Sequence, residues 1–164
     1  MSNPVPLTNT DVNELFFDHN NPRLAEYGIN AETSEKEILK ILWEAMDVRE
    51  LVQSISASGF FPHEALIIAE EKDRKIVIEG NRRLAAVKVL LSGEAGQENG
   101  WTIPKLSVKA RGGLQTLPTI LSDREGAWRY LGFKHVNGPA KWSSYAKAAY
   151  IASVHKLYSI PLVS

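Results

Sequence analysis

The stretch Lys75-Ile-Val-Ile-Glu-Gly-Asn-Arg-Arg-Leu-Ala-Ala-Val-Lys-Val-Leu-Leu-Ser-Gly93 determines the fold expected for this chain. Its first part, Lys75 to Glu79, is a short apolar run that is typical of a buried strand. Gly80 permits a sharp backbone turn, and an amphipathic helix is expected from about Asn81 to a point near Gly93. The inward side chains of this helix are expected to be Leu84, Val87 and Leu91.

Two arginines, Arg82 and Arg83, fall in the first turn of this expected helix. The free N–H groups and the positive end of the helix dipole already favour an anion there, so two further positive charges are unfavourable unless something negative is bound. A phosphate group is the natural candidate, because guanidinium groups bind phosphate oxygens in pairs. The alternative is a helix with two exposed arginines that pack against acidic neighbours. The segment lacks the glycine-rich loop and the Lys-Ser/Thr pair of a P-loop, and it is not a dinucleotide-binding fingerprint.

The flanking sequence predicts a small mixed α/β domain, in which short strands alternate with helices. Ser34 and Glu37 form a capping box at the start of one helix, and a second helix runs from Val48 to a stop at Gly59. Ala65–Ala69 and the strand before Gly80 are joined by a charged turn and therefore predict a hairpin. The other expected elements are a strand at Val12–Phe17, a polar excursion at Glu94–Gly100, a strand at Leu106–Ala110, a helix from Ser122 that ends before His135, and a last helix at Trp142–Tyr158.

The composition restricts the class of protein. A chain of 164 residues with 44% hydrophobic residues is long enough for one domain with a sizeable core. It contains no apolar run long enough to span a membrane and no signal peptide at Met1–Thr10, so we expect a soluble, cytoplasmic protein with no membrane partner. The absence of cysteine excludes disulfides, thiolate metal sites and a cysteine nucleophile.

The net charge of zero conceals an uneven distribution. Residues 1–100 contain 10 Lys and Arg against 17 Asp and Glu, a balance of −7, whereas residues 101–164 contain 9 against 2, a balance of +7. The basic C-terminal part either faces a polyanion or neutralises the acidic part across an internal interface. The sequence leaves both readings open.

Three pieces of sequence follow one another in an informative order. An Asn-Pro-Arg turn at Asn21–Arg23 comes first, then a helix end at Leu51-Val-Gln-Ser-Ile-Ser-Ala-Ser-Gly-Phe60, and then the Gly80-Asn-Arg-Arg-Leu-Ala-Ala86 box, followed by a segment entered through Ile103-Pro104. This succession resembles the N-terminal domain of the ParB family, which shares its fold with sulfiredoxin. The resemblance covers residues 10–110 well and residues 120–155 loosely.

The resemblance implies a nucleotide pocket, because ParB proteins bind and hydrolyse CTP with Mg²⁺. It places the triphosphate on Gly80, Asn81, Arg82 and Arg83, with Arg23 closing from the opposite wall. The base or ribose side would be lined by Gly59, Phe60 and Phe61. It also implies a nucleotide-binding core over residues 1–115 and a helical segment over residues 116–164, which would lead into a DNA-binding region beyond the chain.

Several departures from the family pattern restrict this expectation. Asn81 replaces the usual Glu of the arginine box, and the usual Gln before Pro62 is missing. The third family box is altered, and the residues that take its place are Lys134, His135 and Asn137. These changes put both CTP as the nucleotide and its hydrolysis in question. Sulfiredoxin chemistry is excluded, because it needs a cysteine where this chain has Asn81.

Three functions remain in competition. The first is a switch-like domain of a ParB-type DNA-associated protein that binds CTP or ATP with Mg²⁺, with DNA and a second copy of the chain as expected partners. The second is an enzyme on the same fold, a Mg²⁺-dependent nucleoside triphosphatase, phosphotransferase or nuclease, with Glu79 or His135 as the general base. The third is a module that binds a phosphate backbone without nucleotide turnover.

Overall fold

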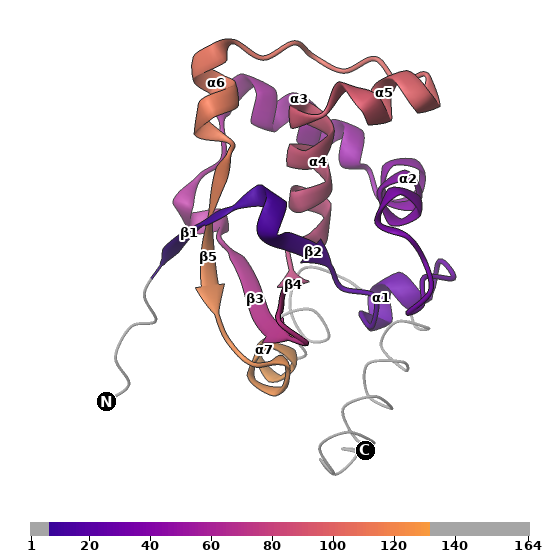
Figure 1. Cartoon of the computed structure of the whole chain (residues 1–164), viewed down its shortest axis with the longest axis vertical. Coiled ribbons are helices and arrows are strands. Elements are labelled where there is room, and N and C mark those ends of the chain that lie inside the picture. The colour runs from indigo at the N-terminus through magenta and orange to yellow at the C-terminus, as the bar shows by residue number, and fades with distance from the viewer. Residues whose placement is uncertain (1–6, 132–164) are drawn as a thin grey trace.

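A mixed five-stranded sheet in the order β1-β5-β3-β4-β2 carries the part of the chain that the computed structural model describes, residues 7–131 (Figure 1). Strands β3 and β4 form an antiparallel hairpin, and β1 pairs antiparallel with β5. Two pairs are parallel, β2 with β4 and β3 with β5. The strands are β1 Thr8–Asp11, β2 Leu15–Phe17, β3 Leu66–Glu71, β4 Arg74–Glu79 and β5 Thr116–Leu121. The mixed α/β class expected from the sequence is confirmed.

Helices connect and cover these strands. Figure 1 shows α2, α3 and α4 gathered together, while α6 and α7 lie at opposite ends of β5. The α-helices are α1 Pro22–Ala25, α2 Glu35–Ala45, α3 Val48–Ser58, α4 Asn81–Leu91, α5 Gly93–Asn99, α6 Val108–Gly113 and α7 Arg124–Leu131. Two short 3-10 helices complete the described part, η1 at Val12–Glu14 and η2 at Pro62–Glu64.

Helix α4 is the most deeply buried helix of the described part. Its side chains from Leu84 to Leu90 are buried with the exception of Lys88, so it is covered on more than one face. Ala85 and Ala86 are fully buried, and their small side chains allow the backbone of α4 to approach its neighbours closely. The arginine box at the start of α4 is therefore built on a rigid part of the core.

The sequence predicted the central elements correctly. The turn at Gly80 between β4 and α4, the β3–β4 hairpin and the helix that begins after Ser34 are all present. Ser34 caps α2 as expected, because its Oγ accepts a hydrogen bond of 3.1 Å from the Glu37 N–H. Helix α3 ends before Gly59, which has a φ of 78°.

The strand predicted at Leu106–Ala110 is wrong. Ser107 instead caps α6, accepting a 3.0 Å hydrogen bond from the Ala110 N–H, and Val108 is 91% exposed. Apolar residues at this spacing predicted a strand, but Leu106 packs against the core while Val108 remains exposed, and the segment pairs with no strand of the sheet. The strand of this region is β5, so the segment 116–164, expected to be helical, begins with a strand of the sheet.

Two other elements differ in detail. Glu94–Gly100, expected to be an irregular polar excursion, is mostly helix α5. Val12–Phe17, expected to be one strand, is divided into η1 and the short strand β2, because Asp11 caps a 3-10 turn by accepting a 2.8 Å hydrogen bond from the Asn13 N–H. The helix predicted at Trp142–Tyr158 lies outside the described residues.

Candidate functional site

The arginine box begins with a glycine that no other residue can replace without strain. Gly80 has φ 105° and ψ 20°, a left-handed conformation that L side chains rarely adopt. A Cβ atom at this position would collide with Cδ2 of Leu66 on β3. The chain therefore passes close to β3 as it leaves β4, and α4 begins at once, with the Leu84 N–H donating to the Gly80 carbonyl at 2.9 Å.

The first turn of α4 carries two arginines and no acidic residue, and no side chain caps it. The N–H groups of such a turn have no partner within their own helix. The helix start that the sequence predicted after Gly80 is confirmed, and an uncapped helix start favours an anion in general.

The parallel pairing of β2 with β4 brings a second segment to the same place. Phe17 at the end of β2 is in register with Val77, so the chain that follows β2 leaves the sheet beside Gly80. In open α/β sheets, the carboxyl ends of parallel strands are the usual location of ligand sites. The Asp18–Arg23 turn, which follows β2, occupies this position.

Two asparagines fasten that turn to the end of β4. Asn21 caps α1, its Oδ1 accepting from the Arg23 N–H at 2.8 Å, while its Nδ2 donates to the Ile78 carbonyl at 3.3 Å. On the other side, Oδ1 of Asn81 accepts from the Asp18 N–H at 3.2 Å. The Asn-Pro-Arg turn and the arginine box, about sixty residues apart in the sequence, are thus joined by direct hydrogen bonds.

Asn81 serves mainly to hold this arrangement. Its side chain is only 7% exposed, and its Nδ2 donates to the Val77 carbonyl at 2.8 Å while its Oδ1 receives the Asp18 N–H. The amide therefore bridges β4 and the turn after β2. The sequence predicted that Asn81 contacts a phosphate. Because its side-chain amide bridges β4 and the turn, the backbone N–H of Asn81 is the donor available for such a contact.

Arg23, Arg82 and Arg83 gather around this turn. The pKa of Arg23 is lowered from its ordinary value, first by burial and then by the charge of Arg82, with Glu79 acting in the opposite direction. The pKa of Arg83 is lowered by burial as well, and Arg82 again adds to the effect, although Glu79 and Glu64 oppose it. The charge of Arg82 therefore repels both Arg23 and Arg83 in a partly buried environment.

The two arginines of the box also have structural partners. Nε of Arg82 donates to the Met46 carbonyl at the end of α2, at 2.5 Å, and its Nη2 lies 3.5 Å from the Asp47 carbonyl. Arg83 donates through Nη1 to the Glu64 carbonyl, and its Nη2 lies 3.6 Å from Oε1 of Glu79. The sequence alternative of arginines packed against acidic neighbours anticipated a contact like that of Arg83 with Glu79, but not the contacts with backbone carbonyls. A guanidinium has five N–H donors, so each arginine keeps donors beyond those used here.

Arg23 differs from the other two arginines. Within residues 7–131, no hydrogen bond or ion pair reaches its guanidinium, although its backbone N–H is held by Asn21. The side chain is partly buried all the same. Arg23 is therefore the cation of this cluster with the most unused donors.

The residues expected on the base or ribose side lie in the segment that joins α3 to η2. Gly59 closes α3, Phe60 packs against the core, and Phe61 is 44% exposed. This segment runs into η2, whose Glu64 carbonyl receives Arg83. The candidates of the third box, Lys134, His135 and Asn137, lie outside the described residues.

A buried ionic network beside the site escaped the sequence analysis. Arg124 of α7 donates to both carboxylate oxygens of the fully buried Asp18, at 3.0 and 2.9 Å, and to both oxygens of Glu71 at 2.8 and 2.7 Å. Burial raises the pKa of Asp18 against the opposing effect of Arg124, whereas the hydrogen bond from Arg124 lowers the pKa of Glu71. The network ties α7 to the turn that Asn81 also holds.

Two features are absent from the described residues. No group of three or more of their His, Asp or Glu side chains is placed to hold a metal ion. None of the helices in this part of the chain has the length and the apolar character needed to cross a membrane.

Comparison with known proteins does not assign the chain to a family. No model of a known protein family matches it, and no curated protein is significantly similar to it.

Proposed function

We propose that this domain binds the phosphate groups of a nucleoside triphosphate, CTP or ATP, at the turn between β4 and α4. The observation that carries the proposal is the convergence of Arg23, Arg82 and Arg83 at the uncapped start of α4. Mutual repulsion and partial burial make this cluster costly for the free protein, and an anion with several oxygens relieves both.

The proposed binding mode uses each part of the site differently. Phosphate oxygens accept from the free N–H groups of the first turn of α4, which the conformation of Gly80 aims outward from the end of β4. Arg82 and Arg83 contribute the donors that their structural contacts leave over, and Arg23 contributes its whole guanidinium. Phe61, which is exposed at the neighbouring segment, offers an apolar surface for the base.

In this proposal Mg²⁺ is held at the site mainly by the phosphate groups of the nucleotide. Mg²⁺ bound with nucleotides is usually held by phosphate oxygens, waters and one or two carboxylates. Glu79 is the carboxylate beside the arginines, and it already lies 3.6 Å from Nη2 of Arg83. We therefore propose that the metal enters with the triphosphate and that Glu79 is the protein residue nearest to it. Because Glu79 is paired with Arg83, nothing favours it as a general base. We therefore propose nucleotide binding and assign no residue to hydrolysis.

The resemblance to ParB proteins agrees with the proposed binding of a nucleoside triphosphate. Two of the three sequence pieces of the resemblance, Asn21–Arg23 and Gly80–Ala86, are joined by hydrogen bonds at the end of β4, and the third lies on α3, which packs against α4. Asp18, which is hydrogen-bonded to the box through Asn81, also holds α7 through Arg124. We propose that occupation of the box is transmitted to α7 and onward to a DNA-binding partner region, as in a switch.

Isothermal titration calorimetry with Mg²⁺ and a panel of four nucleoside triphosphates tests the proposal. We expect saturable binding of at least one of them to the unaltered chain. The variant of choice is Arg23→Gln, because no described residue depends on the Arg23 guanidinium for a hydrogen bond or ion pair, whereas Arg82 and Arg83 hold backbone carbonyls. Loss of one charge-assisted phosphate contact is expected to weaken binding about tenfold or more.

The matched control is Arg49→Gln, which removes an exposed arginine from α3. It is expected to bind as the unaltered chain does. No heat with any triphosphate, or an equal affinity in the Arg23→Gln variant, would contradict the proposal. Binding of DNA that depends steeply on salt and is indifferent to every nucleotide would instead favour a phosphate-backbone module.

A further inference from the structure

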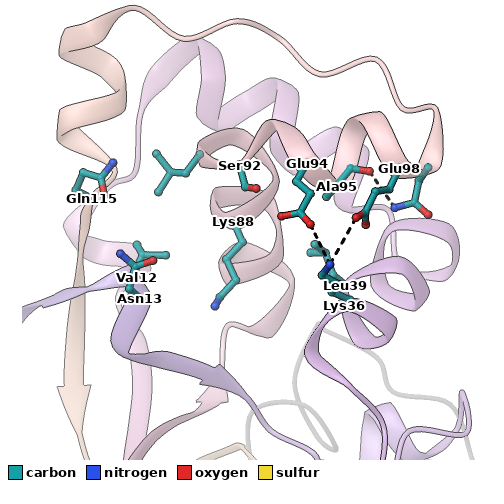
Figure 2. Close-up of a pocket in the computed structure, with 12 residues that line it drawn as sticks. Val12, Asn13, Lys36, Leu39, Lys88, Ser92, Glu94, Ala95, Glu98 and Gln115 are labelled. Carbon is teal, nitrogen blue, oxygen red and sulfur yellow. Dashed lines mark hydrogen bonds and ion pairs between the residues drawn. The ribbon is translucent and has the colours of Figure 1, made fainter.

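A separate cavity of about 420 Å³ lies along α4, away from the arginine box (Figure 2). Figure 2 shows residues of α2 and α5 on one side of the cavity, Val12, Asn13 and Gln115 on the other, and Lys88 of α4 between them. The volume is within the range of small-molecule pockets. Lys88, which projects from α4 in Figure 2, is six residues beyond Arg82, a rise of about 9 Å along the helix.

Lys88 is the unusual residue of this cavity. Its side chain is partly buried, and burial lowers its pKa from the ordinary value. Its Nζ lies 5.7 Å from the centre of the Phe17 ring, and Glu35 is the neighbouring carboxylate. That carboxylate already accepts the Phe17 N–H at 3.1 and 3.4 Å. Within residues 7–131, no hydrogen bond or ion pair reaches the Lys88 ammonium, which lines the cavity.

Lys36, the second lysine of the cavity, is paired with carboxylates. Nζ of Lys36 lies 3.0 Å from Glu94 and 3.5 Å from Glu98, so two carboxylates share one ammonium at the rim. All three side chains are largely exposed and are screened by water. The rim as a group carries one negative charge in excess, which disfavours multiply charged anions more strongly than singly charged ones, and Lys88 is the lysine of the lining without such a pair.

The rest of the lining is suited to an organic ligand. Val12, Leu39 and Leu91 supply apolar surface, and Leu39 and Leu91 are only partly buried. The side-chain amides of Asn13 and Gln115 are exposed beside them and carry hydrogen-bond donors. An ammonium whose neighbouring carboxylate, Glu35, does not line the cavity, amide donors and an apolar wall form a combination that recognises one negative charge on a small apolar body.

We propose that this cavity binds a small monocarboxylate. The carboxylate accepts from Nζ of Lys88, and the apolar part of the ligand packs against Leu39 and Leu91. This site is independent of the proposed triphosphate site, since it uses a different cation at a different position along α4.

Amide NMR spectra of the isotope-labelled full chain test this site with three probes. Isovalerate has the charge and the apolar body, isoamyl alcohol has the same body without the charge, and inorganic phosphate has charge without the body. We expect isovalerate to give saturable shifts at Asn13, Leu91 and Gln115, and the alcohol to bind there at least about tenfold more weakly. Phosphate is expected to leave these three signals unchanged.

Lys88→Met removes the ammonium and keeps most of the side-chain length, and we expect it to weaken isovalerate binding about tenfold. Lys40→Met removes an exposed lysine of α2 that does not line the cavity and is the matched control, expected to bind normally. The comparison of the probes uses the unaltered chain, so it decides the matter even if Lys88→Met does not fold. Equal affinity for the alcohol, saturating phosphate shifts at the cavity, or no saturable isovalerate shift would each overturn the proposal.

Discussion

At the scale of single residues, Gly80 illustrates how closely the site depends on backbone geometry. Its positive φ and the space taken by Leu66 are two independent reasons for the absence of a side chain. The first can be inferred from a glycine between a strand and a helix. The second requires the position of β3 relative to β4, which the sequence does not give directly.

The first prediction follows from this pair of reasons. Gly80→Ala adds both backbone strain and a collision with Leu66, and we expect it to lower the free energy of unfolding by about 2 kcal/mol or more. Urea denaturation measures the change. The control is Gly113→Ala in α6, where φ is not positive and a Cβ would meet nothing within 4 Å. Equal stability of the two variants would show that the turn tolerates a side chain.

The position of Arg82 and Arg83 could be predicted from the sequence, but the partners of their side chains could not. The sequence correctly placed Arg82 and Arg83 in the first turn of a helix after a strand. It did not reveal that their guanidinium groups hold the carbonyls of Met46 and Glu64, because these partners lie about twenty to forty residues away. Backbone oxygens compensate part of the positive charge of Arg82 and Arg83. A substitution of Arg23 therefore tests anion binding with less disturbance of the fold.

At the scale of elements, α7 is attached to the core by a charge network. Asp18 is fully buried, and Arg124 is its ionic partner within the described residues. An aspartate followed by a turn and an arginine early in a helix are both visible in the sequence. Nothing in their spacing indicated that residues 106 positions apart would meet.

The second prediction concerns Arg124→Met. This change leaves the Asp18 carboxylate buried without a counter-charge, and we expect a loss of about 3–5 kcal/mol near pH 7. Burial raises the pKa of Asp18, so the folded variant binds a proton more readily than the unfolded chain and regains stability as the pH falls. The unaltered chain instead loses the contribution of Glu71 below the ordinary pKa of that group, because Arg124 lowers the pKa in the folded state. The difference between the two proteins should therefore shrink in acid.

Urea denaturation near neutral pH and at about pH 4 measures both parts of this prediction. Arg129→Met on the same helix is the control, since Arg129 forms an exposed pair with Glu125 at 2.7 Å. We expect that control to change stability by less than about 0.5 kcal/mol. A loss for Arg124→Met that is as small as the control, or that grows in acid, would contradict the role given to the network.

Strand β5 explains why one element was misplaced. Pro118 argues against a central strand, because proline cannot donate to a ladder. The register resolves the conflict: Pro118 is opposite Asn9 of β1, and pairing with β3 begins at Leu66 and Thr119. Proline thus lies where β5 has a partner on one side. Local pattern favoured Leu106–Ala110 instead, and only the tertiary partners distinguish the two segments.

At the scale of the whole molecule, the topology creates the candidate site. Parallel pairing of β2 and β4 places the ends of both strands at one edge, and the segments that follow them carry Arg23 and the arginine box. The order of the motifs in the sequence suggested a shared location. The hydrogen bonds from Asn21 to Ile78 and from Asp18 to Asn81 supply the physical reason for it.

The central claim is that phosphate groups bind at the start of α4. The most direct measurement is a titration of the isotope-labelled full chain with Mg²⁺ and inorganic tripolyphosphate, followed in the amide NMR spectrum. We expect saturable shifts that are largest for the N–H groups of Asn81, Arg82 and Arg83, with smaller shifts at Arg23. Shifts that do not saturate, or that are largest elsewhere in the chain, would contradict that claim.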